Sequence, residues 1–371
     1  MKFLDYIQVN PTIKLEKDKQ YPFVEMANAD VFAREPKQID IKKYFSGVKF
    51  QRGDTVIARI EPCLQNGKGF FVKNISEGFG STEFLVFRPK DDKVTNEFLY
   101  YFMLTDYIRK SMINSMTGAT GRQRVNKDIF KSLELSLPSI EKQKRIADIL
   151  SAYDDLIENN QKQIKLLEEA AMRLYKEWFV KLRFPGYENS KIVDGVPEGW
   201  RLGRVSELAE FKRGKTITKK NAKDGNVPVV AGGLEPAYFH NVANTVAPVI
   251  TISASGANAG YTRLYNTDIW ASDCSYIDAS YGDKLYFIYT FLKNNKEVID
   301  NLQRGAAQPH VYAKDINALS TYIPESTIME PFCNLVAPLF KKIAVQERLI
   351  SELKQARDKL LPKLMNGEIE V

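Results

Sequence analysis

Two stretches of the sequence, TGATGRQRVNKDI at residues 117–129 and RGAAQPHVYAKDI at residues 304–316, decide the fold of this 371-residue chain. Both carry a Gly-Ala pair near the start and end on Lys-Asp-Ile, and the second begins 187 positions after the first. Because internal repetition fixes an architecture before any local pattern does, the two stretches predict a duplicated unit.

The segments around these loops repeat as well. Residues 96–116 and 283–303 are aromatic-rich and helix-like, and each leads into one of the loops. Downstream, LELSLP ends at Pro138 and LSTYIP ends at Pro324. Both patterns predict a short alternating strand that a proline terminates.

A long helical pattern follows each proline. Apolar residues recur in steps of four and three over more than four heptads, which is the period of helices that supercoil around a partner. The layers of the first helix are Ile146, Leu150, Tyr153, Ile157, Asn160, Ile164, Leu167, Ala171, Leu174 and Trp178. The positions 186 residues later, eight of them apolar, are Phe332, Val336, Leu339, Ile343, Gln346, Ile350, Leu353, Arg357, Leu360 and Leu364.

The fifth layer is an amide in both helices, Asn160 and Gln346. A buried amide lowers stability but fixes the register and the choice of partner, so we predict that these two residues set the register of a helix pair. The alternative is that both amides face water at a break in the apolar stripe. Pro331 and Pro338 predict that the second helix starts late, bends near Pro338 or begins in two pieces, because proline removes a helical hydrogen bond.

Each predicted helix has about 38 residues and a length of roughly 57 Å. The other copy is the nearest partner that could cover its apolar side, and an antiparallel pair would relate the two copies by a pseudo-twofold axis. The predicted fold class is therefore α/β (α+β), with two duplicated domains separated by two long antiparallel coiled-coil helices. The predicted segments are residues 1–138 (first domain), 139–183 (first long helix), 184–199 (linker), 200–324 (second domain) and 325–371 (second long helix).

The net charge of +7 is concentrated in the two domains: residues 1–138 carry +5 and residues 200–324 carry +3. Excess positive charge attracts polyanions, so each domain is a candidate nucleic-acid binder, with a generic basic surface as the alternative. Cys63, Cys274 and Cys333 lie far apart, without CxxC spacing and with only two histidines in the chain, which argues against a metal site and fits a reducing compartment. The sequence shows no signal-peptide core and no membrane-spanning run, so we expect a cytoplasmic location.

Six segments carry a resemblance to a known family: GSTEFLVFRP (80–89), GATGRQRV (118–125), LSLPSIEKQKRIADIL (135–150), GVPEGWRLGRVSELAEFKRGK (195–215), RGAAQPHV (304–311) and RDKLLPKLMNGEI (357–369). In this order, and with the duplication, the chain resembles the specificity (S) subunit of type I restriction-modification systems over nearly its whole length. It departs from that pattern in lacking a PEGW-like lead-in to the first domain and an EKQ run in the second helix.

The resemblance implies two target-recognition domains that bind double-stranded DNA with a bipartite site. It implies assembly with two modification (methyltransferase) subunits, and with motor-endonuclease subunits for cleavage. S-adenosylmethionine, ATP and Mg are then expected only in those partner subunits, and this chain is expected to hold no cofactor and no metal.

The candidate DNA contacts are basic and polar side chains in the predicted loops. Arginine and glutamine can bond guanine or adenine edges, whereas lysines in a glycine-containing loop suit phosphate contacts. In the first domain these candidates are Arg59, Lys68, Arg122, Gln123 and Arg124. In the second domain they are Lys212, Arg213, Lys215, Lys219, Lys220, Ser255, Asn258, Arg263, Gln308, His310 and Tyr312. The alternative for both sets is a tight turn or an ordinary solvated surface.

An enzyme acting on DNA is the rival class of function. A methyltransferase needs a Gly-rich cofactor loop and an Asn-Pro-Pro-aromatic segment, and a motor needs a GxxxxGK[ST] loop; the sequence has none of these. We therefore predict a non-catalytic DNA-recognition protein. A stand-alone two-headed DNA-binding protein or regulator remains the alternative.

Overall fold

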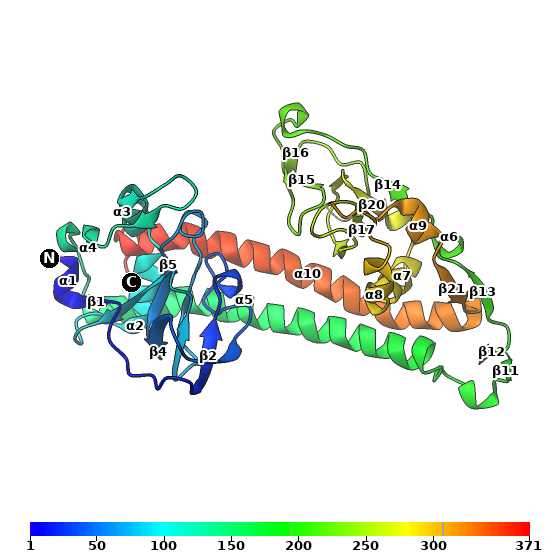
Figure 1. Ribbon diagram of the computed structural model, residues 1–371, viewed down its shortest axis with the longest axis horizontal. Coiled ribbons are helices and arrows are strands. Elements are labelled where there is room, and N and C mark those ends of the chain that lie inside the picture. The colour runs from blue at the N-terminus through cyan, green and yellow to red at the C-terminus, as the bar shows by residue number, and fades with distance from the viewer. Residues whose placement is uncertain (194, 306–307) are drawn as a thin grey trace. The chain divides into compact units, whose positions relative to one another are not determined.

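The computed structural model describes residues 1–193, 195–305 and 308–371, and it divides into two compact units (Figure 1). Unit 1 comprises Met1–Asn160 and Leu349–Val371, and unit 2 comprises Gln161–Arg348. Asp194 in the predicted linker, and Ala306 and Ala307 in the second loop, lie outside the described residues. Each unit combines one mixed helix-and-sheet domain with a part of each long helix.

Unit 1 contains two four-stranded sheets. The first has the order β1-β8-β5-β6 with antiparallel neighbours, and its strands are β1 (Ile7–Val9), β8 (Phe84–Pro89), β5 (Thr55–Ala58) and β6 (Gly69–Phe71). The second has the order β3-β2-β7-β4, and its strands are β3 (Asp40–Lys43), β2 (Gln20–Val24), β7 (Glu77–Gly80) and β4 (Val48–Gln51). β2 and β7 run parallel, and all other neighbours run antiparallel.

Unit 2 repeats the first sheet and three of the four strands of the second sheet. Its first sheet has the order β14-β20-β17-β18, with strands β14 (Lys212–Arg213), β20 (Cys274–Ile277), β17 (Val249–Ser253) and β18 (Thr262–Tyr265). Its second sheet has the order β16-β15-β19, with strands β16 (Tyr238–His240), β15 (Val227–Val230) and β19 (Trp270–Ala271). β15 and β19 are parallel, as β2 and β7 are in unit 1. The predicted duplication is therefore confirmed.

The helices follow one another in the same order in both units. The matched short helices are α1 (Phe3–Tyr6) and α6 (Val205–Leu208), α2 (Asn96–Met103) and α7 (Lys284–Asn294), α3 (Asp106–Asn114) and α8 (Lys296–Asp300), and α4 (Ile129–Ser132) and α9 (Ala313–Asn317). The long helices are α5 (Ile140–Tyr175), which continues into a π-helical turn at Lys176–Val180, and α10 (Ser326–Met365).

The strands predicted before the two long helices form only in the second copy. β21 (Ser320–Ile323) pairs with β13 (Arg201–Arg204), as predicted for residues 319–324. Residues 133–138 make only an isolated bridge between Glu134 and Lys2, so the strand predicted there is wrong. In the second copy four residues of each strand pair, whereas the first copy has this single bridge.

Two of the outcomes predicted for the second long helix, a late start and a beginning in two pieces, are wrong, and a bend near Pro338 stays a prediction. α10 begins at Ser326, directly after Pro324 and Glu325, and continues without a break past Pro331 and Pro338. Phe332, Val336 and Phe340 are at most 2% exposed and belong to one buried cluster of unit 2. We infer that this burial offsets the hydrogen bonds that the two prolines remove.

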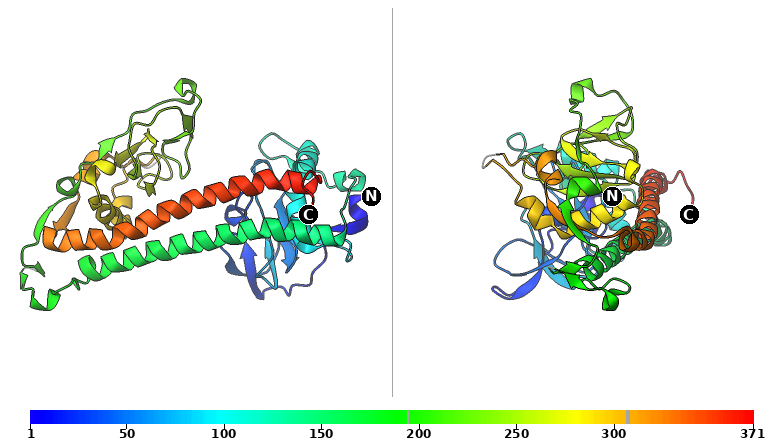
Figure 2. Two further views of the ribbon diagram at one scale, coloured as in Figure 1. Left: turned by 180° about the vertical axis from the view of Figure 1, so that it is seen from behind. Right: turned by 90° about the vertical axis from the view of Figure 1, so that its right-hand side faces the viewer.

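Within each unit, α5 and α10 pair in opposite directions (Figure 2). In unit 1 the Arg357 Nη1 atom lies 2.5 Å from the Asp154 Oδ1 atom, and in unit 2 the Gln346 Nε2 atom donates to the Gln163 Oε1 atom at 2.6 Å. The contact that lies later on α5 thus lies earlier on α10, which is the antiparallel arrangement that the sequence predicts.

Both seam amides are buried, so the alternative that they face water is wrong. Asn160 is 7% exposed and Gln346 is 2% exposed. Asn160 donates to the Leu156 oxygen of its own helix at 2.7 Å, whereas Gln346 bonds across to Gln163. The amides that the sequence pattern matched therefore bond to different partners, and their role in setting the register stays a prediction.

Candidate nucleic-acid interface

In unit 1 the predicted contact residues lie where the end of β5 meets the loop before β10 (Arg124–Val125). β10 pairs with β9 (Met116–Thr117) and closes the loop between them, and Gly118 in that loop has φ 120°, which favours glycine. The Arg59 oxygen accepts from the Val125 N–H at 2.9 Å, and the Glu61 N–H donates to the Gln123 oxygen at 2.9 Å. Backbone bonds thus fix both ends of the loop.

A carboxylate lies at the centre of this site. Glu83 precedes β8, and its main-chain oxygen accepts from the Arg59 N–H at 2.8 Å. Its carboxylate accepts from Arg124 through Nε at 3.0 Å and Nη2 at 2.7 Å, and it lies 3.6 Å from the Arg59 Nε atom. The hydrogen bond to Glu83 raises the pKa of Arg124 above its ordinary value. Glu83 therefore orients two of the predicted arginines.

The other predicted residues of unit 1 differ in how far the domain itself holds their side chains. Arg122 is exposed, and no described residue holds its guanidinium. Gln123 is half-buried, and its side chain donates to the Gly118 oxygen at 3.5 Å. Lys68 is half-buried, and its ammonium donates to the Met26 oxygen at 3.2 Å. This ammonium therefore already has a hydrogen-bond partner inside the domain. Arg122 is the side chain that most freely meets a ligand.

Unit 2 builds the same frame from different side chains. The Val311 N–H donates to the Ala254 oxygen at 3.0 Å, and the Ala254 N–H donates to the Asp273 oxygen at 3.2 Å. Ser255 bridges His310 in the position where Ile60 bridges Arg124 in unit 1. Asp273, which precedes β20, thus corresponds to Glu83, and His310 corresponds to Arg124.

The carboxylate of Asp273 also gathers predicted residues. The Ser255 hydroxyl donates to its Oδ2 atom, and the Arg213 Nη2 atom lies 3.6 Å from its Oδ1 atom. His310 stacks on Tyr312 with ring centroids 5.9 Å apart. The structure therefore brings together Arg213, Ser255 and His310, which come from three separate segments of the sequence.

The remaining predicted residues of unit 2 surround this cluster. Gln308 and Tyr312 are exposed, whereas Asn258 is half-buried and donates to the Gly232 oxygen at 3.5 Å. Arg263 donates to the Leu234 oxygen at 2.7 Å and lies over the Tyr265 ring at 4.7 Å, so its guanidinium is held inside the domain.

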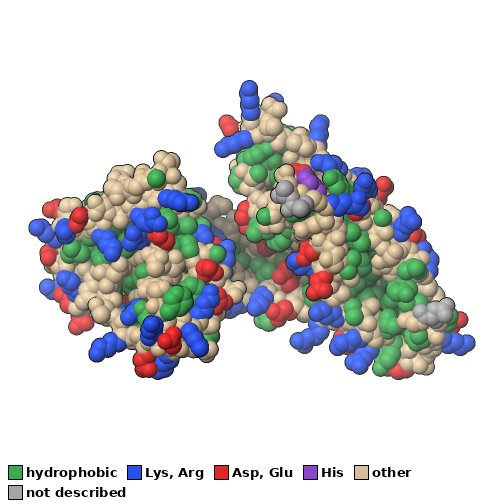
Figure 3. All heavy atoms as spheres, in the orientation of Figure 1, with side chains coloured by type: hydrophobic (Ala, Val, Ile, Leu, Met, Phe, Trp, Pro, Cys, Tyr) green, Lys and Arg blue, Asp and Glu red, His purple; other side chains and the backbone are tan. Residues whose placement is uncertain are grey.

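The lysine-rich run is fixed along the edge of the same sheet. The Gly214 N–H donates to the Cys274 oxygen at 2.8 Å, and a Cβ atom on Gly214 would collide with the Ser272 oxygen, so only glycine fits there. The exposed side chains of this run are Lys212, Arg213, Lys215, Lys219, Lys220 and Lys223. Basic side chains project from the end of unit 2 where β15 and β16 lie, as Figure 3 shows.

The sequence predictions did not include the two carboxylates. Glu83 lies in GSTEFLVFRP, one of the segments that carry the family resemblance, and Asp273 lies in ASDCS. The common signal is an acidic residue directly before a buried strand in each copy. Both carboxylates form ion pairs or hydrogen bonds with the cationic or hydroxyl groups around them. They therefore hold the predicted contact residues in place.

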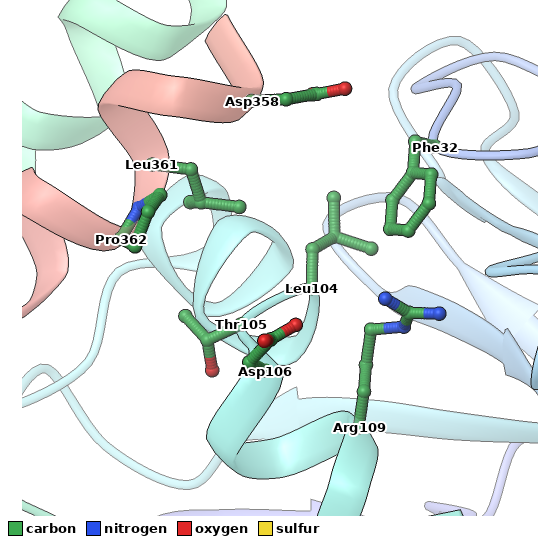
Figure 4. Close-up of a pocket in the computed structure, with 8 residues that line it drawn as sticks. All are labelled: Phe32, Leu104, Thr105, Asp106, Arg109, Asp358, Leu361 and Pro362. Atoms are coloured by element: carbon green, nitrogen blue, oxygen red, sulfur yellow. The ribbon is translucent and has the colours of Figure 1, made fainter. Parts of the chain in front are cut away.

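A cavity of about 270 Å³ in unit 1 lies away from these residues (Figure 4). Leu104, Leu361 and Pro362 supply apolar walls, and Arg109 points toward Phe32, with its guanidinium carbon 4.5 Å from the ring centroid. Burial lowers the pKa of Arg109. None of the predicted DNA contacts lines this cavity.

In the described part of the chain, no three His, Cys, Asp or Glu side chains gather as metal ligands do. No helix among the described residues has an apolar stretch of the length that crosses a membrane.

Comparison with known proteins identifies relatives of the whole chain. A family model described as the type I restriction modification DNA specificity domain matches residues 5–169 and again residues 197–355. The MjaIX specificity subunit of Methanocaldococcus jannaschii is 30% identical over 310 residues, covering 76% of this chain and 71% of that protein. The HindI specificity subunit of Haemophilus influenzae is 24% identical over 408 residues, covering 86% of this chain and 87% of that protein.

A solved structure supports the fold independently. The crystal structure of a type I restriction-modification S subunit from M. genitalium superposes with a TM-score of 0.57 at 18% identity, covering 98% of this chain and 95% of that one. Specificity subunits are the non-catalytic DNA-recognition components of these systems, which agrees with the expectation that this chain is not an enzyme. With two matches that span most of its length, the chain belongs to the type I restriction-modification DNA specificity family.

Proposed function

We propose that each domain reads one half of a bipartite double-stranded DNA site, and that the helix pair sets the spacing between the half-sites and docks two modification subunits. The relatives are named as specificity subunits of type I restriction enzymes. On this proposal the protein acts in the cytoplasm and holds no cofactor. S-adenosylmethionine, ATP and Mg belong to the modification subunits and to motor-endonuclease subunits.

One observation carries the proposal: the two domains place different side chains on the same backbone frame. Arg124 in unit 1 and His310 in unit 2 occupy the same bridge position, beside Glu83 and Asp273 respectively. Different donors on one frame are what two different half-sites require, because base edges are distinguished by their pattern of donors and acceptors.

The test compares one exposed loop residue from each domain. Arg122→Ala removes the free guanidinium of unit 1, and Gln308→Ala is the matched change in unit 2. Each variant is expressed with modification subunits in cells that lack the native gene, and the methylated sites are mapped by sequencing. We expect each variant to relax one half-site only, with a discrimination loss of about 1–3 kcal/mol where the residue makes a bidentate base contact.

Two results of this methylation mapping would contradict the proposal. Identical changes at both half-sites in either variant would refute the assignment of one domain to each half-site. Unchanged methylation in cells that lack the gene altogether would refute the proposed function itself.

A further inference from the structure

A buried charged layer joins the two long helices in unit 1. Asp154 on α5 is 2% exposed and Arg357 on α10 is 5% exposed, and the two form an ion pair at 2.5 Å. The Tyr101 hydroxyl donates to the other oxygen of Asp154 at 2.6 Å. Burial lowers the pKa of Arg357, whereas the charge of Asp154 raises it. The net result is a pKa above the ordinary value of arginine. Each charge in this layer is therefore compensated.

The corresponding layer of unit 2 is apolar. With the 186-residue offset between the helices, Phe340 on α10 corresponds to Asp154, and Ala171 on α5 corresponds to Arg357. Ala171 is fully buried and Phe340 is 2% exposed, and both belong to the same buried cluster. Phe340 stacks on Tyr286 at 4.8 Å and meets Tyr289 edge-on at 5.6 Å. The layer in unit 1 is thus held by an ion pair, whereas the corresponding layer in unit 2 is held by aromatic packing.

This difference determines what each helix could accept as a partner. In an antiparallel pair of two α5 helices from different chains, Asp154 of each would face Ala171 of the other. In a pair of two α10 helices, Arg357 would face Phe340. The pair of two α5 helices would bury the carboxylate of Asp154 without a cation, which is strongly destabilising. In the pair of two α10 helices, Arg357 would lose Asp154 and keep only the ion pair with its neighbour Asp358. Only α5 against α10 places Asp154 opposite Arg357 and Ala171 opposite Phe340.

The amide layer discriminates in the same direction for α10. Gln346 bonds to Gln163 of α5, and the offset places Leu349 of α10 in the position of Gln163. In a pair of two α10 helices, Gln346 would face Leu349 and lose that partner, and a buried amide without a partner is costly.

We propose that the Asp154–Arg357 pair is a partner-selection device, which makes α5 accept α10 and reject a second copy of α5. The apolar residues of the seam supply most of the attraction, but they are alike in the two copies and cannot distinguish them. For α5, the selection lies in the charged layer, where the two copies differ.

The test is a change of pairing in the full-length chain. Asn160→Cys, Gln163→Cys and Gln346→Cys provide a reporter. Positions 163 and 346 touch in the native pair, and the offset places position 160 of α5 where position 346 of α10 lies. Oxidation therefore links positions 163 and 346 of the same chain when α5 meets α10, and it links position 163 to position 160 of another chain when α5 meets α5. Peptide mapping by mass spectrometry distinguishes the two disulfides. The reporter removes the amide layer from every background equally, so any difference between backgrounds comes from the charged layer.

The reporter is placed in the native background and in Tyr101→Phe/Asp154→Phe/Arg357→Ala, which copies the apolar layer of unit 2 into unit 1. Both proteins are unfolded and refolded at the same concentration. We expect the ratio of the intermolecular 163–160 disulfide to the intramolecular 163–346 disulfide to rise at least tenfold in the apolar background. Equal ratios in the two backgrounds would overturn the proposal.

Two further variants keep the test decisive. If circular dichroism shows that the first triple variant does not fold, Tyr101→Phe/Asp154→Leu/Arg357→Leu replaces it with the same expected rise. Asp154→Arg/Arg357→Asp with Tyr101→Phe reverses the pair and keeps it compensated, so it should retain the native ratio. A reversed pair that behaves like the apolar variant would show that charge does not select the partner.

Discussion

The two units of this protein share one framework and differ in what they place on it. In unit 1 Glu83 holds two arginines, Arg59 and Arg124, whereas in unit 2 Asp273 holds a serine hydroxyl and only one arginine, Arg213. The main-chain bonds around both carboxylates are the same. The comparison teaches that the backbone carries the common architecture, and that the side chains on it can diverge without a change of fold.

The same contrast recurs along the helices. Asp154 and Arg357 form the buried layer of unit 1, and Ala171 and Phe340 occupy the corresponding positions in unit 2. Asp155 pairs with Arg34 in unit 1, whereas its counterpart Lys341 pairs with Asp283 in unit 2, so the sign of the helix charge is reversed. Four predictions test how far these differences extend.

The largest expected effect separates the two buried layers. Arg357→Leu leaves the carboxylate of Asp154 buried without its cation and should destabilise unit 1 by about 3–5 kcal/mol. The matched change Phe340→Leu keeps an apolar side chain in unit 2 and should cost less than about 1.5 kcal/mol. Urea unfolding followed by circular dichroism measures both losses.

The fluorescence of tryptophan gives an internal control. All three tryptophans, Trp178, Trp200 and Trp270, lie in unit 2. In Arg357→Leu, the unfolding transition followed by circular dichroism should therefore shift to a lower urea concentration. The transition followed by tryptophan fluorescence should shift less. Equal losses of stability in Arg357→Leu and Phe340→Leu would contradict the difference between the layers. Asp154→Leu/Arg357→Leu should recover most of the loss.

A smaller effect separates the two carboxylates. Glu83→Gln releases Arg59 and Arg124, and Asp273→Asn releases only Arg213. A freed cation that reaches a phosphate steepens the dependence of DNA affinity on salt by about one unit of log–log slope. We expect a larger increase in slope for Glu83→Gln than for Asp273→Asn, measured by fluorescence anisotropy across a salt series. The same slope in both variants would show that the carboxylates do not restrain these cations.

The pH dependence of unit 1 should show a still smaller effect. The hydrogen bond from Arg34 lowers the pKa of Asp155. A carboxyl whose pKa is lower in the folded state stabilises the fold above its unfolded pKa of about 3.9 and loses that contribution as the pH falls further. Because Asp155 is 58% exposed, we expect no more than about 0.5 kcal/mol.

Asp155→Asn supplies the measurement. Its unfolding free energy should lie below that of the native protein at pH 7, and the difference should disappear as the pH falls through the folded-state pKa of Asp155. A difference that persists at the acidic end would mean that the side chain acts through packing and not through its charge.

The smallest effect concerns thiol reactivity. Burial raises the pKa of Cys274 to about 12 and that of Cys333 to about 11, and both lie in unit 2, whereas Cys63 in unit 1 is partly exposed. A disulfide reagent at pH 8 should therefore label one thiol rapidly in the native chain, because only the thiolate reacts. Cys63→Ser should abolish the rapid phase, and a rapid phase that survives this change would contradict the expected protection of unit 2.

Much of the fold followed from the sequence because it rests on periodic patterns. Leu150 and Ile157 were predicted in the seam and are buried, since a heptad period can be read from residue numbers alone. Asp154 was missed because it lies one position from the predicted layer at Tyr153. The signal for it was Arg357, a charge in an apolar series that required a buried partner.

The candidate site was less accessible to prediction. Arg59, Glu83 and Arg124 lie far apart in the sequence, and strand register brings them together. Residue type suggested the arginines, but the sequence did not show that Glu83 would hold two of them. Lys68 shows the opposite limit, because its type suited DNA while its position directs the ammonium to the Met26 oxygen.

The Gly-Ala loop of each repeat is anchored at both ends by main-chain bonds, between Thr117 and Arg124 in one copy and between Arg304 and His310 in the other. The second loop is one residue shorter, yet the anchors are preserved. Insertions, deletions and exchanges between the anchors therefore leave the folding core untouched. On the proposed function, such a segment can acquire a new preference for bases by small steps, while the rest of the molecule continues to assemble as before.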